Sequence, residues 1–170
     1  YGIELEGSLN ITDEWSVFAT YAWTDSEITE RISVDQADLL GWDGVDPAVR
    51  DQLGDVSGQE SPRTPEHQIS LTTRYEQSIA WRDSRWFVAF NWAHEDSKWS
   101  QEHNLIETGD RNIAGFQAGF ITGPWEFILW GRNIFDEEYN TFGVNFASLG
   151  PITEQFGEEA SFGLDVTFEF

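Results

Sequence analysis

The sequence contains no cysteine and no long apolar run. Without cysteine, disulfides and thiolate metal sites are excluded. Without about eighteen consecutive apolar residues, a transmembrane helix is not expected. The mean hydropathy of -0.44, taken alone, is typical of a soluble protein. A membrane β-barrel has the same low average, because half of each strand faces a polar interior.

Basic residues are also scarce: nine Lys and Arg stand against thirty-one Asp and Glu, and the formal net charge is -22. Nucleic-acid binding is therefore not expected, because contacts with phosphates need clustered Lys and Arg. Docking on an anionic membrane leaflet is disfavoured for the same reason. The acidic balance indicates either a solvated surface or a field that attracts cations and cationic ligands.

Aromatic residues, by contrast, make up 15% of the chain, with nine Trp and thirteen Phe. The last ten residues alternate strictly between polar and apolar side chains, which predicts a strand with one face of each kind. A strand of about ten residues with this alternation is the unit of a transmembrane β-barrel. The apolar face of this strand consists of Phe162, Leu164, Val166, Phe168 and Phe170.

The same alternation recurs earlier in the chain, and several apolar faces begin or end with an aromatic residue, as at Trp15 and Trp23. Aromatic rings at both ends of a lipid-facing stripe are typical of membrane interfaces. We therefore expect an all-β fold, an antiparallel segment of a transmembrane barrel. A β-sandwich, which buries one face of each strand, shows the same alternation. The predicted strands are residues 3–11, 15–23, 67–76, 86–93, 114–120, 125–132 and 161–170.

The expected connections alternate between short and long. Residues 12–14, 77–85 and 122–124 are short, whereas residues 29–66, 96–110 and 136–160 are long. Outer-membrane barrels have this asymmetry, with short periplasmic turns and long extracellular loops. Counting back from a periplasmic C-terminus places every long loop outside. In the longest loop, Asp46 followed by Pro47 predicts a short helix over 48–53 that Gly54 ends.

Catalysis has little support, because the sequence has no nucleophile elbow, no His-Glu-x-x-His and no phosphate-binding glycine loop. We therefore predict no enzymatic activity. His94 and His103 lie among carboxylates that could bind a divalent metal. Their spacing fits no defined site, which favours a solvated polar loop, and we assign no metal or cofactor. Carboxylates for Ca²⁺ or Mg²⁺ are available in the longest loop, without the twelve-residue calcium pattern, at Asp35, Asp38, Asp43, Asp46, Asp51 and Asp55.

Aromatic and imidazole side chains in the expected loops could contact a ligand, although they could equally pack the loops together. The inward faces of the strands form a charged wall, on which Arg132 could pair with Asp165 or Glu169. Asn133 and Asp136 are more typical of a turn, because both side chains bond to nearby backbone. The candidate ligand contacts are Trp42, His94, Trp99, His103, Tyr139 and Phe142.

Four stretches together resemble the C-terminal part of the barrel of a TonB-dependent outer-membrane receptor. The terminal strand with Phe170 is similar to the assembly signal of that family, which the barrel-assembly machinery recognises. The resemblance covers essentially the whole chain, residues 1–170, as one barrel segment. The other three stretches are Gly2–Glu6 with Ala22–Glu27, Arg63–His67 and Gly131–Tyr139.

The resemblance implies a bacterial outer-membrane protein with a barrel of about twenty-two strands and an N-terminal plug domain. It further implies uptake of a ferric siderophore or a similar scarce nutrient, driven by the TonB complex. Lipid, lipopolysaccharide, the remaining barrel and the plug would then surround this chain. No plug-like stretch is present in the sequence. Seven strands alone would leave two unpaired edges, so we expect no transport by this segment alone.

Two other functions stay open on the sequence. One is a secreted all-β module that binds carbohydrate through its many Trp side chains. The other is an outer-membrane barrel of another kind, such as an adhesin, a porin or an enzyme. Dependence on detergent would separate the first from a membrane barrel.

Overall fold

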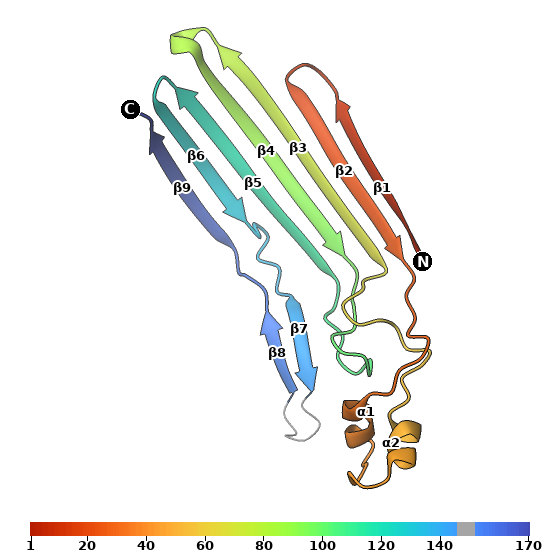
Figure 1. Cartoon of the computed structure of the whole chain (residues 1–170). Helices are drawn as coiled ribbons and strands as arrows, with labels where there is room; N and C mark the ends of the chain where they lie inside the picture. Colours follow the sequence, from red (N-terminus) through yellow and green to blue (C-terminus); the bar gives the residue numbers. More distant parts are fainter. Residues whose placement is uncertain (146–151) are drawn as a thin grey trace.

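The structure, a computed structural model, describes residues 1–145 and 152–170. Its main feature is an open antiparallel sheet in which consecutive strands lie side by side (Figure 1). This sheet confirms the seven predicted strands and their meandering order. The strands are β1 (Gly2–Asn10), β2 (Trp15–Thr24), β3 (His67–Ile79), β4 (Ser84–Glu95), β5 (Arg111–Thr122), β6 (Trp125–Arg132) and β9 (Ser161–Phe168).

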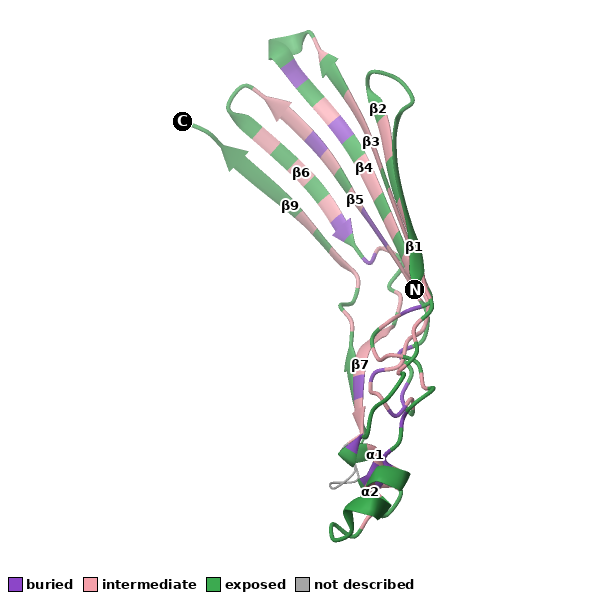
Figure 2. Cartoon of the chain, turned by 45° about the vertical axis from the view of Figure 1, so that its right-hand side comes forward, coloured by how far each residue is buried: buried purple, intermediate pink, exposed green. Residues whose placement is uncertain are grey.

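The register of the sheet places apolar side chains beside apolar side chains. Leu71 of β3 pairs with Ala19 of β2 on one side and with Trp92 of β4 on the other. Residues that pair directly in a sheet point to the same face, so this face is an apolar band across all the strands. In the described part of the chain no second sheet covers the band, and the edge strand β1 is exposed along its whole length (Figure 2). Leu5 is 60% exposed and Leu164 is 62% exposed. A β-sandwich would bury these side chains.

Aromatic rings follow the two borders of the apolar band. At one border Tyr75 lies 5.4 Å from Trp86, and Trp125 lies 4.7 Å from Phe168, measured between ring centroids. At the opposite border Tyr1 packs edge-on against Trp23. This arrangement is typical of strands that cross a bilayer with their amphipathic rings at the two interfaces.

The connections at the two ends of the sheet differ in length, as the sequence predicts. At the turn end, Thr12 accepts hydrogen bonds from the backbone of Glu14 and Trp15, and Gly123 has a φ of +54°. The connection expected over 77–85 is shorter than predicted, because β3 and β4 extend into it and leave mainly the 3-10 turn η1 (Trp81–Asp83). The long connections gather at the opposite end, called the loop end (Figure 1).

Two short helices lie in the first long loop, α1 (Val34–Leu39) and α2 (Pro47–Leu53). The predicted helix is α2: Asp46 accepts a hydrogen bond from the Ala48 amide, and Gly54 is the C-cap. Helix α1 was not predicted; its N-cap Ser33 accepts a hydrogen bond from the Gln36 amide. Among the described residues, no helix is long and apolar enough to cross a membrane.

The third long loop contains a second, smaller sheet, where the sequence analysis expected only a loop over 136–160. It is the hairpin of β7 (Asn140–Asn145) and β8 (Ile152–Phe156). The strands are too short to show a strong alternation, which is why the prediction failed here. Gly143 fits close to Ile106 of the second loop, at a distance that excludes a Cβ atom. Contacts with another loop therefore help to fix this hairpin.

Candidate functional site: a groove on the polar face

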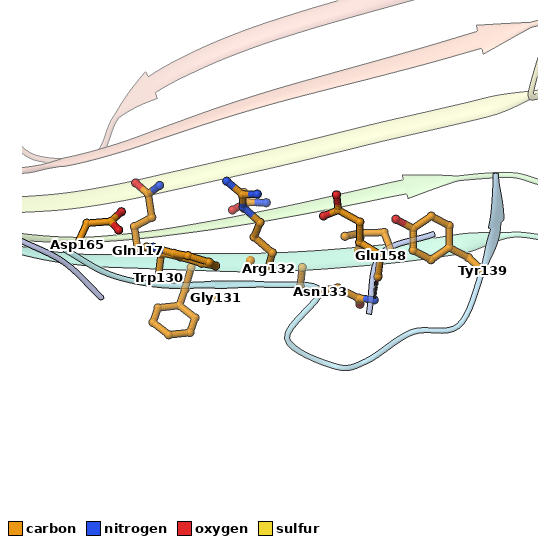
Figure 3. Close-up of a pocket in the computed structure, with 13 residues that line it drawn as sticks. Gln117, Trp130, Gly131, Arg132, Asn133, Tyr139, Glu158 and Asp165 are labelled. Carbon is orange, nitrogen blue, oxygen red and sulfur yellow. Dashed lines mark hydrogen bonds between the residues drawn. The ribbon is translucent and has the colours of Figure 1, made fainter. Parts of the chain in front are cut away.

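The polar face of the sheet carries a groove of about 470 Å³ near the loop end (Figure 3). Its walls come from β4, β5, β6, β9 and the third loop, and they include Gln117, Trp130, Tyr139 and Asp165. A second hollow of about 370 Å³ shares Ile113 and Tyr139 with the first. The two hollows therefore lie next to each other and are together called the groove, and concave sites of this kind are where ligands usually bind.

Arg132 and Trp130 both line the first hollow (Figure 3). The guanidinium carbon of Arg132 lies 5.1 Å from the centroid of the Trp130 ring, within the range of a cation–π contact. Trp130 pairs with Gly163 on β9, and its ring fills the space that a side chain at Gly163 would need. The stacked guanidinium stays exposed, so its donors remain available to an anionic or carbonyl-bearing ligand.

The ion pair expected between Arg132 and Asp165 or Glu169 is wrong for the described part of the chain. The sheet register gives the reason, because Arg132 pairs with Ser161 and Asp165 stands four residues further along β9. At about 3.3 Å per residue, the two Cα positions are separated by about 13 Å along the strand. Glu169 lies further still toward the turn end.

A second cationic group borders the other hollow. Arg111 donates to Glu95 across 2.9 Å, and Lys98 pairs with the other oxygen of the same carboxylate. The Arg111 guanidinium also lies 5.5 Å from the centroid of the Tyr139 ring. Two cations thus share one carboxylate. This cluster was not predicted, because Glu95 and Arg111 lie outside the predicted strands 86–93 and 114–120 and pair only in the longer strands β4 and β5.

Asn133 closes the loop-end side of the groove. Its side-chain amide donates to the backbone oxygens of Glu137 and Glu158, and its carbonyl accepts from the Glu137 amide. Asp136 accepts a hydrogen bond from the Ala160 amide. Asn133 is 3% exposed and has a φ of +43°, a conformation that Asn tolerates better than most residues. The predicted bonding to nearby backbone is confirmed for Asn133, whereas the Asp136 side chain bonds to backbone at the far end of the loop. Together the two residues join the ends of the third loop.

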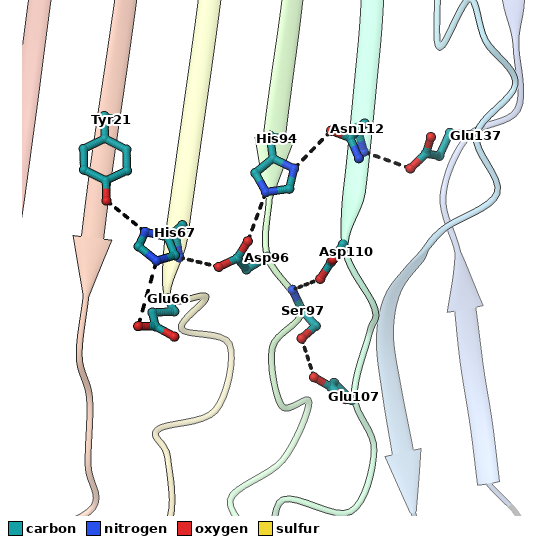
Figure 4. Close-up of polar contacts among 10 residues, drawn as sticks. All are labelled: Tyr21, Glu66, His67, His94, Asp96, Ser97, Glu107, Asp110, Asn112 and Glu137. Atoms are coloured by element: carbon teal, nitrogen blue, oxygen red, sulfur yellow. Dashed lines mark hydrogen bonds and ion pairs between the residues drawn. The ribbon is translucent and has the colours of Figure 1, made fainter.

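A row of polar side chains crosses the loop end of the apolar face (Figure 4). Tyr21 bonds to His67 Nδ1 at 2.9 Å, and the His67 amide donates to Asp96 at 3.1 Å. His94 bonds to Asp96 through Nε2 and to Asn112 through Nδ1, each at 3.0 Å. Both nitrogens of His94 are therefore engaged by protein partners. This row marks where the apolar band ends.

The predicted ligand residues fall into different places. Tyr139 lines the groove, whereas the His94 side chain lies on the apolar face with Asp96 and Asn112, although His94 is among the residues around the second hollow. Three others make contacts within or between the loops. Trp42 donates to the Asp46 carbonyl, and the Trp99 carbonyl accepts from the Arg63 amide. The Phe142 ring lies under the Arg63 guanidinium. His103 is buried in the second loop. Ligand contact by these six residues stays a prediction, with the geometry favouring Tyr139.

Several carboxylates of the acidic first loop stabilise local turns. Asp43 accepts from the Val45 amide, Asp46 caps α2, and Asp55 accepts from both the amide and the hydroxyl of Ser57. The hydrogen bonds from Ser57 lower the pKa of Asp55. Within residues 1–145 and 152–170, no three His, Asp or Glu side chains come together as a metal site would need. Binding of Ca²⁺ or Mg²⁺ by this loop stays a prediction.

The sequence matches no protein-family model and no curated protein. The fold is similar to the ferric yersiniabactin uptake receptor FyuA from Yersinia pestis, with a TM-score of 0.73 and 13% identity over 99% of this chain and 23% of that one. It is also similar to the siderophore receptor PiuA from Acinetobacter baumannii, with a TM-score of 0.72 and 22% identity over 98% of this chain and 21% of that one. This chain therefore spans less than a quarter of either receptor. The chain therefore shares its fold with a section of each of these two receptors.

Proposed function

We propose that this chain is part of the barrel wall of an outer-membrane receptor that imports a ferric siderophore or a similar scarce nutrient. The observation that carries the proposal is the two-faced sheet. Its apolar band is bordered by aromatic rings on both sides, and its polar face carries ion pairs and a groove. The likeness in fold to two siderophore receptors supports the same function.

The two faces have separate roles in this proposal. The apolar band contacts lipid, and the polar row of His67, Asp96 and His94 meets the lipopolysaccharide head groups. The polar face looks into the barrel, where Glu76 pairs with Arg74 at 2.6 Å and with Arg85 at 3.4 Å. Such pairing offsets the desolvation of charges when a plug domain fills the interior.

The groove is the proposed contribution of this wall to ligand passage. It lies beside the long loops, on the side from which a nutrient enters if those loops are extracellular. Arg132 presents cationic donors beside Trp130, and Arg111 does so beside Tyr139. Lys98 lies next to Arg111, since both bond to Glu95. A ferric siderophore is bulky and carries several oxygen donors, so stacked guanidinium groups suit it. Energy from the TonB complex would reach the ligand through the plug, outside this chain.

The experiment uses the complete protein that contains this chain, expressed in a bacterium that lacks its own siderophore receptors. Cells are tested for uptake of ⁵⁵Fe bound to catecholate, hydroxamate and phenolate siderophores, and the membranes are fractionated. We expect the protein in the outer membrane, and uptake of at least one complex that stops when the proton-motive force is collapsed. Recovery of the protein in the soluble fraction would contradict the proposal. So would uptake equal to that of receptor-free cells for every complex.

A further inference from the structure

The second loop, residues 96–110, is bonded to the first loop, residues 25–66. The Arg63 amide donates to the Trp99 carbonyl at 2.7 Å, and Asn104 Nδ2 donates to the Glu60 carbonyl at 3.2 Å. Arg31 forms an ion pair with Glu102. These contacts join residues that lie far apart in the sequence. The first two loops therefore form one packed body.

The second loop is bonded equally well to the third loop, residues 133–160. The Gly143 amide donates to Ser100 Oγ at 3.0 Å in a buried position, and the Asn145 amide donates to Gln101 Oε1 at 2.6 Å. Ile106 packs so closely on Gly143 that a Cβ atom has no room there. The second loop thus lies between the other two and holds both.

His103 is buried within this connecting loop. Its exposed fraction is 3%, and among the residues that the structure describes neither of its ring nitrogens has a hydrogen-bond partner. Buried polar groups without partners are rare in folded proteins, so the burial of this imidazole is unusual. Its burial fits the neutral ring far better than the charged one, because a buried charge without a bonded partner is unfavourable.

Two charged groups act on His103: Asp35 of α1, and Glu102, which precedes His103 in the sequence. Burial lowers the pKa of His103, and the two carboxylates counteract this effect only in part. Glu102 is already engaged by Arg31. In the packed loops the ring is therefore neutral at neutral pH, and protonation favours any arrangement that brings it into water.

We propose that His103 is a pH-sensitive latch, which keeps the three loops packed at neutral pH and releases them in mild acid. The direction follows from linkage. A histidine with a lower pKa in the packed state than in the open state stabilises packing above the open-state pKa. This stabilisation is lost as the pH falls below the open-state value, which is about 6.5. Because the second loop holds both neighbours, all three loops respond together. The inference rests on the packing of the loops and is independent of nutrient transport.

Hydrogen exchange of the complete protein in detergent tests the latch. The reporters are the amides of Arg63 and Gly143, which bond to the second loop from opposite sides. Protection factors, corrected for the intrinsic exchange rate at each pH, are compared at pH 7.5 and pH 5.0. We expect both amides to lose protection at pH 5.0, by up to about thirtyfold for an open-state pKa of about 6.5. Equal protection at both values would overturn the proposal.

Two variants assign the effect to His103. His103→Phe keeps a ring of similar bulk that cannot be protonated, so protection should not fall at pH 5.0. His67→Gln, outside the loop cluster, is the matched control and should retain the wild-type response. If the loops of His103→Phe pack poorly at both pH values, the variant Asp35→Asn tests instead whether His103 causes the response to acid. It removes a carboxylate that favours the protonated ring, so the loss at pH 5.0 should grow. A response to acid that survives in His103→Phe, or that shrinks in Asp35→Asn, would refute the latch.

Discussion

Trp130 of β6 lies over Gly163 of β9, and the ring occupies the position of the side chain that Gly163 lacks. This pairing keeps Trp130 against the wall of the barrel section. It also places the ring where the Arg132 guanidinium stacks on it. A small residue on the last strand thus shapes the candidate site on the neighbouring strand.

Gly163→Val should destabilise the protein, because the new side chain must displace the Trp130 ring. Overpacking of this kind costs about 1–3 kcal/mol. The urea midpoint of the detergent-solubilised protein, followed by tryptophan fluorescence, measures the effect. Gly7→Val is the matched control, because a Cβ atom at Gly7 meets nothing within 4 Å. Equal midpoints for the two variants would show that the ring does not need the space at Gly163.

A charge on the apolar face should cost far more than a charge on the polar face of the same strand. Leu164 pairs with Leu129 within the apolar band, whereas Thr167 points to the other face beside Glu126. Leu164→Arg should destabilise the folded barrel by about 2–4 kcal/mol if the position lies near the middle of a bilayer. Thr167→Arg should change stability little. Refolding titrations into lipid vesicles measure both, and similar losses would argue against lipid contact at Leu164.

The strands of the large sheet and helix α2 could be predicted from the sequence. The strand alternation predicted all seven strands of the large sheet, because two-faced strands leave a strong periodic signal. Asp46 and Pro47 likewise predicted α2. The missed helix α1 had a weaker signal, a Ser33 cap with Gln36 three residues later.

The groove depends on the register of neighbouring strands and on contacts between loops, which a single sequence does not predict. The stacking of Arg132 on Trp130 requires the register of β6 against β9, which places Gly163 opposite the ring. The predicted carboxylate partner of Arg132, Asp165, lies on the same face but four residues further along β9 than the residue that pairs with Arg132. Similarly, the hydrogen bond from the Gly143 amide to Ser100 depends on how two loops that are far apart in the chain pack against each other. Local patterns contain no signal for such contacts.

Arg132→Ala should weaken capture of the imported ligand, because it removes the exposed guanidinium from the groove. A hydrogen bond to a charged group contributes about 1.5–3 kcal/mol, so the half-saturating concentration should rise at least about tenfold. Arg82→Ala is a closely matched control: that guanidinium also lies 5.1 Å from a Trp ring, Trp81, but at the turn end. Uptake of the ⁵⁵Fe-siderophore complex over a concentration series measures both. A ligand site elsewhere would leave the two variants alike.

Phe170→Ala should reduce the amount of protein that reaches the outer membrane, since the terminal strand is the predicted assembly signal. Phe170 lies beyond the last residue of β9, so its loss should alter the stability of molecules that do assemble only slightly. Quantitative immunoblots of membrane fractions should show a severalfold drop with an unchanged urea midpoint. Phe135→Ala, another exposed aromatic outside the strands, should assemble normally. Normal assembly of Phe170→Ala would remove Phe170 from the predicted signal.

The two free edges of the large sheet run in the same direction. Because the seven strands alternate in direction, β1 and β9 both lead from the loop end to the turn end. Joining these edges directly would create a parallel seam in an otherwise antiparallel sheet. A barrel closed entirely by antiparallel pairs must therefore add an odd number of strands, giving the even total typical of bacterial outer-membrane barrels. The strands that meet β1 and β9 must each run from the turn end to the loop end, which fixes the orientation of any partner segment.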